Sequence, residues 1–157
     1  MKQRMSAYEK SPAALKALFG MGAYLHKSPI EKSLLNLIYF RVSQINGCAY
    51  CLDMHAKDLR AKGESEHRLY VLDAWREAPF YSGRERAALA WAEAVTKISG
   101  GNVPDSVYEE ARKEFSESEL IDLTIAIIAV NSYNRLNISF RTTAGTYEPG
   151  AFEVVAK

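Results

Sequence analysis

The sequence predicts an all-α protein of about seven helices folded as a single domain. No segment alternates apolar and polar residues with the two-residue period of a half-buried β-strand. The chain instead carries the Ser-x-x-Glu pattern of a helix-capping box, whose two side chains each satisfy a free N–H of the first helical turn. This pattern occurs at Ser28/Glu31, Ser82/Glu85 and Ser116/Glu119. Prolines tolerated in a first helical turn are Pro12, Pro29 and Pro104.

Four helices are expected in the first half of the chain, and turn residues set their ends. Their expected ranges are 12–26, 29–45, 48–62 and 65–75. Asn46-Gly47 ends the second helix and Gly63 ends the third, because glycine readily takes the left-handed conformation that follows a helix. Pro79 ends the fourth, since proline cannot continue a helix.

Three more helices are expected in the second half, over residues 83–98, 105–115 and 117–140. Gly100-Gly101 ends the first of them. The last is apolar on most sides between Leu120 and Val130, which is typical of a helix buried in a core or in a subunit interface. Residues 142–157 are punctuated by glycine and proline, so we expect this tail to lie over the surface.

Composition and charge exclude several classes of function. The 157 residues are 48% hydrophobic and 25% charged, which is typical of a globular domain with its own core. Twenty basic and nineteen acidic residues give a net charge of +1, which argues against nucleic-acid binding. The N-terminus lacks a signal-peptide pattern, and the longest apolar stretch is too short to span a membrane. We therefore expect a cytoplasmic protein with no nucleic-acid or membrane partner.

The only two cysteines lie with one histidine in the segment SQINGCAYCLDMH, residues 43–55. Cys48, Cys51 and His55 are spaced i, i+3 and i+7, so they share one face of a helix. Cys48 opens this helix, where the dipole stabilises a thiolate, and His55 is one turn from Cys51, within reach of its proton. A thiolate attacks peroxides, and a second thiol captures the sulfenic acid as a disulfide. The dipole favours Cys48 as the attacking thiol and the histidine favours Cys51, so both stay candidates.

Two other interpretations compete with this redox hypothesis. The three residues could be a buried packing cluster with no chemical role. Zinc is usually held by four ligands, and the segment supplies three; His67 would have to fold back to complete the site, while Asp53 points to another face of the helix. A Cys-x-x-Cys pair in a reducing compartment is more often redox-active or metal-binding than a permanent disulfide. The redox interpretation, without bound metal, is the one we favour.

The segments SQINGCAYCLDMHAKDLRAKGE and LDAWREAPFYSGRERAALAWAEAVT resemble the alkylhydroperoxidase D family of the carboxymuconolactone decarboxylase-like superfamily. The resemblance is specific over the core motif, residues 41–97, and continues through NRLNISFRTTAG at residues 134–145. It implies one domain of this type over residues 1–157, with an all-helical fold that assembles into homo-oligomers, often trimers or hexamers. It also implies reduction of hydroperoxides by a dithiol cycle with a histidine proton relay.

One position departs from the family pattern. The resemblance places the two family cysteines at Cys48 and Cys51 and the relay histidine at His55. The glutamate that usually begins the relay, twelve residues before the first cysteine, is replaced by Asn36. An amide can orient a neighbour but does not accept and release a proton as a carboxylate does. Because a positioned base contributes about 10²–10⁴-fold to a rate, we expect a weak peroxidase or a different substrate.

Three further residues near Asn36 bear on this site. Tyr39 and Ser43 lie one and two turns after Asn36 on a similar helix face and are candidates to line the site. Glu31 is on a different face and is expected to cap the helix instead. His55 would then be the only base.

The resemblance implies a thiol-dependent peroxidase with no bound cofactor, since no segment suggests a flavin, nicotinamide or haem site. The expected reductant is an external dithiol, such as a lipoyl- or thioredoxin-like protein. A dithiol–disulfide oxidoreductase or an oligomeric redox sensor would use the same cysteines. A lactone decarboxylase would not need them, and a metal-binding module would use them as ligands.

Overall fold

The computed structural model describes residues 2–152, and this part of the chain is all-helical, as predicted. Its eight α-helices are α1 (Ala7–Lys10), α2 (Pro12–Leu25), α3 (Lys32–Asn46), α4 (Ala49–Ala61), α5 (Glu66–Tyr70), α6 (Gly83–Thr96), α7 (Asp105–Glu114) and α8 (Glu117–Phe140). Short 3₁₀ helices, Leu72–Ala74 and Ile98–Gly100, follow α5 and α6. The short helix α1 was not predicted, so the count of about seven was one too low for the described residues.

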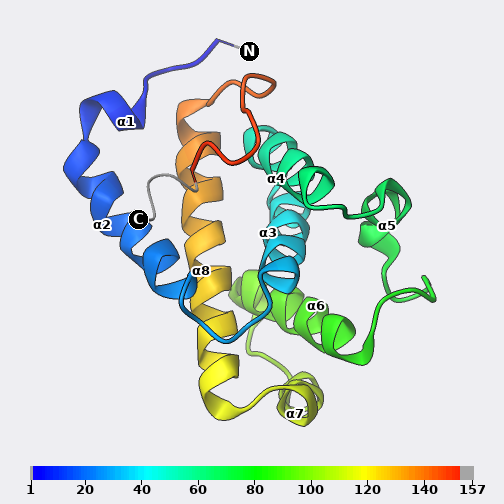
Figure 1. The fold of residues 1–157 in the computed structure, drawn as a ribbon. Helices are drawn as coiled ribbons and strands as arrows, with labels where there is room; N and C mark the ends of the chain where they lie inside the picture. Colours follow the sequence, from blue (N-terminus) through cyan, green and yellow to red (C-terminus); the bar gives the residue numbers. More distant parts are fainter. Residues whose placement is uncertain (1, 153–157) are drawn as a thin grey trace.

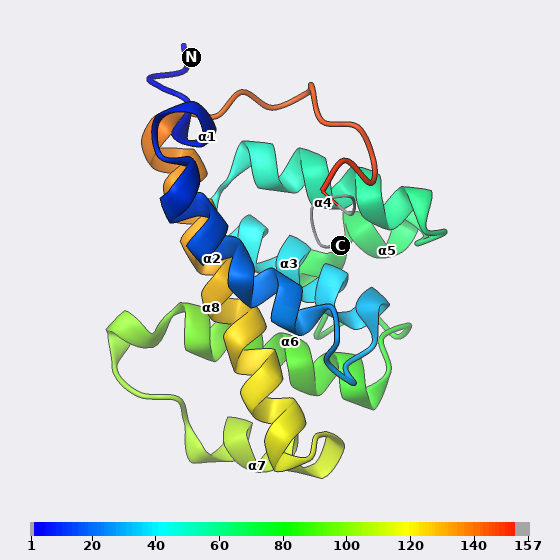
Figure 2. The same ribbon diagram turned by 60° about the vertical axis from the view of Figure 1, so that its left-hand side comes forward.

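Helix α3 lies at the centre of the molecule, packed against α4, α6 and α8. In Figures 1 and 2, α2 lies along one side of α8 and α7 crosses near the beginning of α8. The core fills the space between these helices. Its fully buried large side chains include Leu37, Ile38, Leu72, Leu89, Leu123 and Ile127.

Helix α8 has 24 residues and is apolar on its outer face as well as on its inner face. Leu123 and Ile127 are fully buried, as expected for a core helix, whereas Ile121 is 63% exposed and Ile128 is 44% exposed. A subunit interface on this outer face stays a prediction. Among residues 2–152, no helix combines the length and the apolarity needed to cross a membrane.

Two of the three predicted capping boxes are confirmed. The Ser82 hydroxyl accepts from the Glu85 N–H at the start of α6, and the Ser116 hydroxyl accepts from the Glu119 N–H at the start of α8. In both boxes the glutamate accepts from the backbone N–H of its serine in return. The hydrogen bond from the Ser116 backbone, followed by that from Arg84, lowers the pKa of Glu119 to about 2.

The third capping box, at Ser28/Glu31, was wrong. Helix α3 begins at Lys32 rather than at Pro29, and the Glu31 side chain makes no capping hydrogen bond. Residues distant in sequence bind both side chains instead. The Ser28 hydroxyl donates to Asp122 Oδ2 at 2.6 Å, and Glu31 accepts from Arg84 Nε at 3.0 Å.

The continuous helix predicted over residues 65–75 was also wrong, because the chain bends after Tyr70 into the 3₁₀ helix Leu72–Ala74. This bend brings Trp75 into a buried polar cluster, which we call the Glu93 cluster. Glu93 accepts from Trp75 Nε1 at 2.9 Å, from Arg41 Nη2 at 2.8 Å and from Arg76 Nη1 at 2.7 Å. Burial raises the pKa of Glu93, but these hydrogen bonds outweigh burial, and the pKa lies below its ordinary value.

Candidate active site

The two cysteines are placed by the tight corner between α3 and α4. Gly47 ends α3 in the left-handed conformation, with φ of 67°, which costs glycine little. Cys48 follows as the N-cap of α4, and its N–H donates to the Ser43 carbonyl at 3.1 Å. The Cys48 Sγ accepts from the Cys51 N–H at 3.4 Å, as a serine hydroxyl would at this position. The first turn of α4 therefore holds both sulfurs.

Cys48 and Cys51 form a disulfide, with their Cα atoms 5.3 Å apart. Both residues are buried, with 1% of their surface exposed. Asn137 of α8 donates from Nδ2 to Cys51 Sγ at 3.5 Å. Each sulfur therefore has one N–H donor, from the backbone for Cys48 and from a side chain for Cys51. Nothing local in the sequence indicates the contact with Asn137, because the residue lies 86 positions beyond Cys51.

His55 lies one turn beyond Cys51 on α4 and is buried, with 8% of its surface exposed. Burial, followed by the positive charge of Lys62, lowers the pKa of His55 to about 3. The imidazole is therefore neutral at physiological pH, and its lowered pKa makes it a weak base. The ring of Tyr39 from α3 lies 5.5 Å from the His55 ring, and burial raises the pKa of that phenol. The structure thus places the Tyr39 ring beside His55, and a role for Tyr39 in the site stays a prediction.

Ser43 lies next to the disulfide, but its side chain is not accessible from the surface. It is fully buried, and its hydroxyl accepts from Asn134 Nδ2 at 3.0 Å. Asn134 Oδ1 accepts in turn from Asn46 Nδ2 at 2.9 Å, and Asn131 Oδ1 accepts from the same amide at 2.9 Å. These hydrogen bonds join the end of α3 to α8. Ser43 therefore ties together two helices that position the disulfide.

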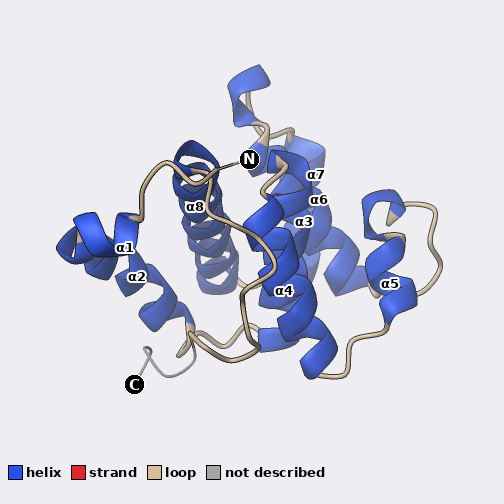
Figure 3. Ribbon diagram, turned by 90° about the horizontal axis from the view of Figure 1, so that it is seen from above, coloured by secondary structure: helices blue, strands red, loops and turns tan. Residues whose placement is uncertain are grey.

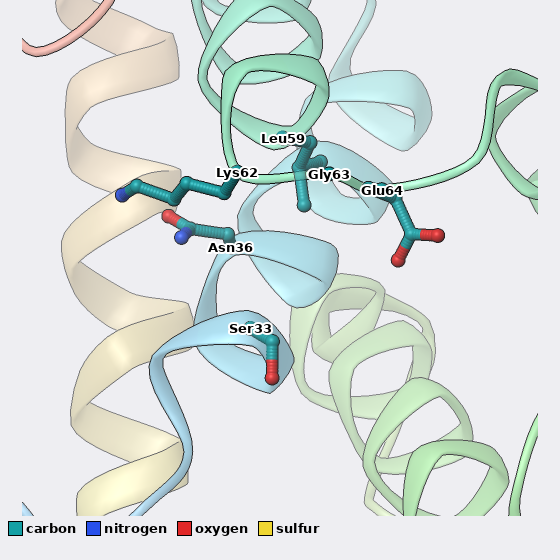
Figure 4. Close-up of a pocket in the computed structure, with 6 residues that line it drawn as sticks. All are labelled: Ser33, Asn36, Leu59, Lys62, Gly63 and Glu64. Carbon is teal, nitrogen blue, oxygen red and sulfur yellow. The ribbon is translucent and has the colours of Figure 1, made fainter.

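Asn36 lies in a pocket of about 350 Å³ between the start of α3 and the end of α4. The pocket is lined by Ser33, Asn36, Leu59, Lys62, Gly63 and Glu64. Figure 4 shows the Asn36 amide and the Lys62 side chain extending in the same direction. Because α3 and α4 run antiparallel from the corner at Gly47, this pocket lies beyond His55 from the disulfide.

The residues considered as metal ligands do not come together in the described part of the chain. Across residues 2–152, no three His, Cys, Asp or Glu side chains are grouped as a metal ion would require. The His67 ring lies 4.9 Å from the ring of Phe80. Asp53 accepts from Lys57 Nζ at 3.0 Å, on α4 itself.

The chain after α8 crosses to α4 and lies along it, as Figure 2 and the view from above in Figure 3 show. Tyr147 is buried, with 6% of its surface exposed, and donates to Asp58 Oδ1 at 3.0 Å. The Gly145 N–H donates to Asp53 Oδ2 at 2.9 Å, and Lys57 Nζ donates to the Tyr147 carbonyl at 3.0 Å. The tail was predicted to lie over the surface, and its described part does so with specific contacts to the helix that carries the disulfide.

Residues 12–94 match the model of the carboxymuconolactone decarboxylase family, which is more than half of the chain. The chain belongs to this family. Over 146 residues it is 42% identical to the uncharacterized protein YdfG of Bacillus subtilis, covering 93% of this chain and 99% of that protein.

Solved structures place this family member among AhpD-like proteins. A protein of unknown function from Agrobacterium tumefaciens, proposed to be the antioxidant defence protein AhpD, matches with a TM-score of 0.89 and 40% identity over 93% of this chain and 100% of its own. A peroxidase-related protein from Silicibacter sp. TM1040 matches with a TM-score of 0.78 and 25% identity, over 89% of this chain and 74% of its own. The debrominase Bmp8, at 22% identity and a TM-score of 0.78 over 88% of this chain and 74% of its own, shares the fold.

Proposed function

We propose that this AhpD-like protein is a thiol-dependent peroxidase that cycles between the Cys48/Cys51 dithiol and its disulfide. The observation that carries the proposal is the position of both sulfurs in the first turn of α4, with the neutral imidazole of His55 one turn further on. Each sulfur has an N–H donor able to stabilise a thiolate. These are the groups that a peroxide-reducing dithiol requires.

The reaction begins with the dithiol form and a hydroperoxide. His55 takes the proton of one thiol, and the thiolate attacks the terminal peroxide oxygen. The O–O bond breaks, the leaving alkoxide takes the proton to become an alcohol, and the attacking sulfur becomes a sulfenic acid. The second thiol attacks this sulfur, water leaves, and the disulfide forms. Two electrons pass from the two sulfurs to the peroxide.

The cycle closes when an external dithiol reduces the disulfide by exchange. A lipoyl- or thioredoxin-like protein is the proposed reductant, with no bound cofactor, in the reducing environment of the cytoplasm. We also propose that the chain forms a homo-oligomer, and the exposed Ile121 and Ile128 on α8 support this part of the proposal.

Asn36 is the reason to expect slow turnover with peroxides. The amide lines the pocket beyond His55 and offers no base to receive a proton from that histidine. A dithiol–disulfide oxidoreductase would use the same two cysteines and would need less proton transfer, because exchange between thiols requires no alkoxide to be protonated. Asn36 favours this second candidate function.

Titration of free thiols tests the peroxidase proposal. The fully reduced protein is treated with one equivalent of cumene hydroperoxide, beside Cys48→Ser, Cys51→Ser and His55→Gln variants. We expect rapid loss of both thiols in the unaltered protein and a trapped sulfenic acid in only one of the serine variants, which identifies the attacking sulfur. His55→Gln should slow the first step by about 10²–10⁴-fold.

Thiols that stay reduced for many minutes would contradict the peroxidase proposal, and the same protein would then be tested with protein disulfides. Asn36→Glu examines the role of the missing carboxylate and should raise the rate with peroxide. An unchanged rate in Asn36→Glu, with an unchanged fold by circular dichroism, would show that Asn36 does not limit the reaction.

A further inference from the structure

Asn137 contacts the disulfide from outside the segment that carries it. It lies near the end of α8, beside the beginning of α4 (Figure 1), and its Nδ2 donates to Cys51 Sγ at 3.5 Å. Among residues 2–152, the Asn137 side chain makes no other hydrogen bond. The amide is half-buried, whereas Cys51 is 1% exposed. This side chain therefore serves the sulfur and no second partner in the described part of the chain.

The two preceding asparagines of α8 are used differently. Asn131 donates from Nδ2 to Thr96 Oγ1 at 3.1 Å, and Asn134 donates from Nδ2 to Ser43 Oγ at 3.0 Å. Both amides bind hydroxyl oxygens, which carry no charge in either redox state of the protein. Asn137 instead binds an atom that can become negatively charged once the disulfide is reduced.

Backbone contacts fix the end of α8 near the disulfide. Arg141 ends the helix in the left-handed conformation, with φ of 56°, and the Thr142 N–H donates to the Asn137 carbonyl at 3.0 Å. The chain then returns to α4, where the Gly145 N–H donates to Asp53 Oδ2 at 2.9 Å. The tail therefore joins the end of α8 to α4 a second time. A donor held in place in this way need not reorganise when charge develops on its acceptor.

Burial makes a negative charge on Cys51 costly. A thiolate surrounded by apolar groups loses the water that would stabilise it, so burial by itself favours the disulfide and the neutral thiol. A hydrogen bond to a charged acceptor is stronger than one to a neutral acceptor. The Asn137 amide consequently stabilises the Cys51 thiolate more than it stabilises the disulfide.

We propose that Asn137 is a catalytic residue, whose amide stabilises the charged form of Cys51 and shifts the equilibrium between disulfide and dithiol toward the dithiol. With glutathione as the reductant, two glutathione molecules supply two electrons, the Cys48–Cys51 bond breaks, and glutathione disulfide forms. Their two protons pass to the two sulfurs, and the proton of Cys51 is released to solvent when that thiol ionises. The inference rests on the dithiol cycle proposed above, but this equilibrium involves no peroxide.

Thiolate titration tests the contact on one sulfur at a time. In the reduced Cys48→Ser protein Cys51 is the only cysteine, and the serine hydroxyl can still accept from the Cys51 N–H. Ultraviolet absorbance of the thiolate then gives the pH at which Cys51 is half ionised. Adding Asn137→Leu should raise this pH by about one unit, a tenfold change in the ionisation equilibrium, because a hydrogen bond to a charged group is lost.

The same substitution in the Cys51→Ser protein is the internal control. Cys48 is then the only cysteine, and no hydrogen bond joins it to Asn137 within residues 2–152, so its half-ionisation pH should not change. Asn131→Leu is the matched control on α8, since it removes an amide that binds oxygen and not sulfur. It should leave the half-ionisation pH of Cys51 unchanged.

Asn137→Asp keeps the shape of the side chain and serves if Asn137→Leu does not fold, which circular dichroism shows. Its carboxylate has no hydrogen to donate and repels a thiolate, so it should raise the half-ionisation pH of Cys51 further. An unchanged pH for Cys51 in a folded Asn137 variant would overturn the proposal. Equal shifts for Cys48 and Cys51 in Asn137→Leu would also overturn it, because an effect through packing acts on both sulfurs.

Equilibration of the protein with both cysteines in glutathione buffers measures the balance itself. Above the half-ionisation pH of Cys51, Asn137→Leu should favour the disulfide about tenfold more than the unaltered protein does. Well below that pH the two proteins should agree, since both thiols are then neutral. A difference that is the same at every pH would indicate a structural effect and contradict the proposal. If hydroperoxides do not oxidise the thiols, the peroxidase proposal fails, while this equilibrium still decides the role of Asn137.

Discussion

Two polar regions lie on opposite faces of α3, and they differ in how many hydrogen-bond partners their polar groups have. On one face Arg41 joins the Glu93 cluster, where one carboxylate accepts from two guanidinium groups and an indole. On the other face Tyr39 contacts His55, whose ring has no hydrogen bond within the described residues. Both regions are buried, but only in the first do charged groups meet and have direct hydrogen-bond partners.

This difference separates a structural role from a chemical one. A buried ion pair whose atoms are all hydrogen-bonded holds helices together, and its carboxylate stays ionised because its partners stabilise the charged form. A buried, neutral imidazole with no hydrogen-bond partner among the described residues can approach a reacting group through its ring nitrogens, although its lowered pKa makes it a weak base. The contrast makes three predictions, given from the largest expected effect to the smallest.

The Glu93 cluster should dominate stability and leave the thiol chemistry unaffected. Glu93→Leu leaves Arg41 buried without its main partner, so we expect the free energy of unfolding in urea to fall by about 3–5 kcal/mol. Asp73→Asn is the matched control, because Asp73 also pairs with Arg41 but its side chain is 79% exposed. It should cost less than about 1 kcal/mol. Equal losses in the two variants would remove the distinction between the two regions.

His55 should affect stability through pH and not through packing. Its folded pKa, about 3, lies below the ordinary value of 6.5, so the unfolded chain binds the proton first as the pH falls. The stability due to neutral His55 is complete above about pH 6.5 and is lost toward pH 3, at about 1.4 kcal/mol per pH unit.

The His55→Gln variant should lack this slope. Urea unfolding is compared between about pH 5 and pH 6.5, above the range in which Glu119 begins to titrate. In that window the unaltered protein should lose stability relative to the variant as the pH falls. Parallel curves for the two proteins would contradict the buried, neutral histidine.

The smallest effect is expected where the tail meets α4. Tyr147→Phe removes the hydroxyl that donates to Asp58, and it should lower the free energy of unfolding by about 1–2 kcal/mol. Tyr70→Phe is the control, since the Tyr70 hydroxyl also donates to a carboxylate, that of Glu66, but the residue is 73% exposed. Thermal unfolding of both variants measures the difference, and a larger loss in Tyr70→Phe would mean that the tail does not stabilise α4.

Local patterns predicted the helices wherever local contacts decide their ends. The boxes at Ser82 and Ser116 satisfy their own first turns, and the sequence placed α6 and α8 correctly from them. The same pattern failed at Ser28, because its hydroxyl binds Asp122, a residue 94 positions away. No sequence pattern distinguishes a serine that caps a helix from one that binds a distant carboxylate.

In the candidate site too, contacts within one helix could be predicted from the sequence, whereas contacts from distant segments could not. The spacing of Cys48, Cys51 and His55 on one helix was sufficient to bring them together. Asn137 and the tail reach α4 from 86 or more residues further along the chain, and no periodicity indicates such contacts. Lys62 was overlooked for another reason: its effect on His55 follows from burial of the imidazole, which only the packed structure reveals.

The burial of the disulfide also determines which step limits the rate of its reduction. A reducing thiolate attacks one sulfur along the axis of the S–S bond, and Cys48 and Cys51, each 1% exposed, offer almost no surface to a reductant in the closed form. The corner between α3 and α4 must therefore open before the exchange step, as local regions of proteins do. The rate of reduction should rise with reductant concentration and then level off at the rate of opening. Small thiols and dithiol proteins would reach the same maximum rate, because that rate is set by the opening of the helix corner and not by the reductant.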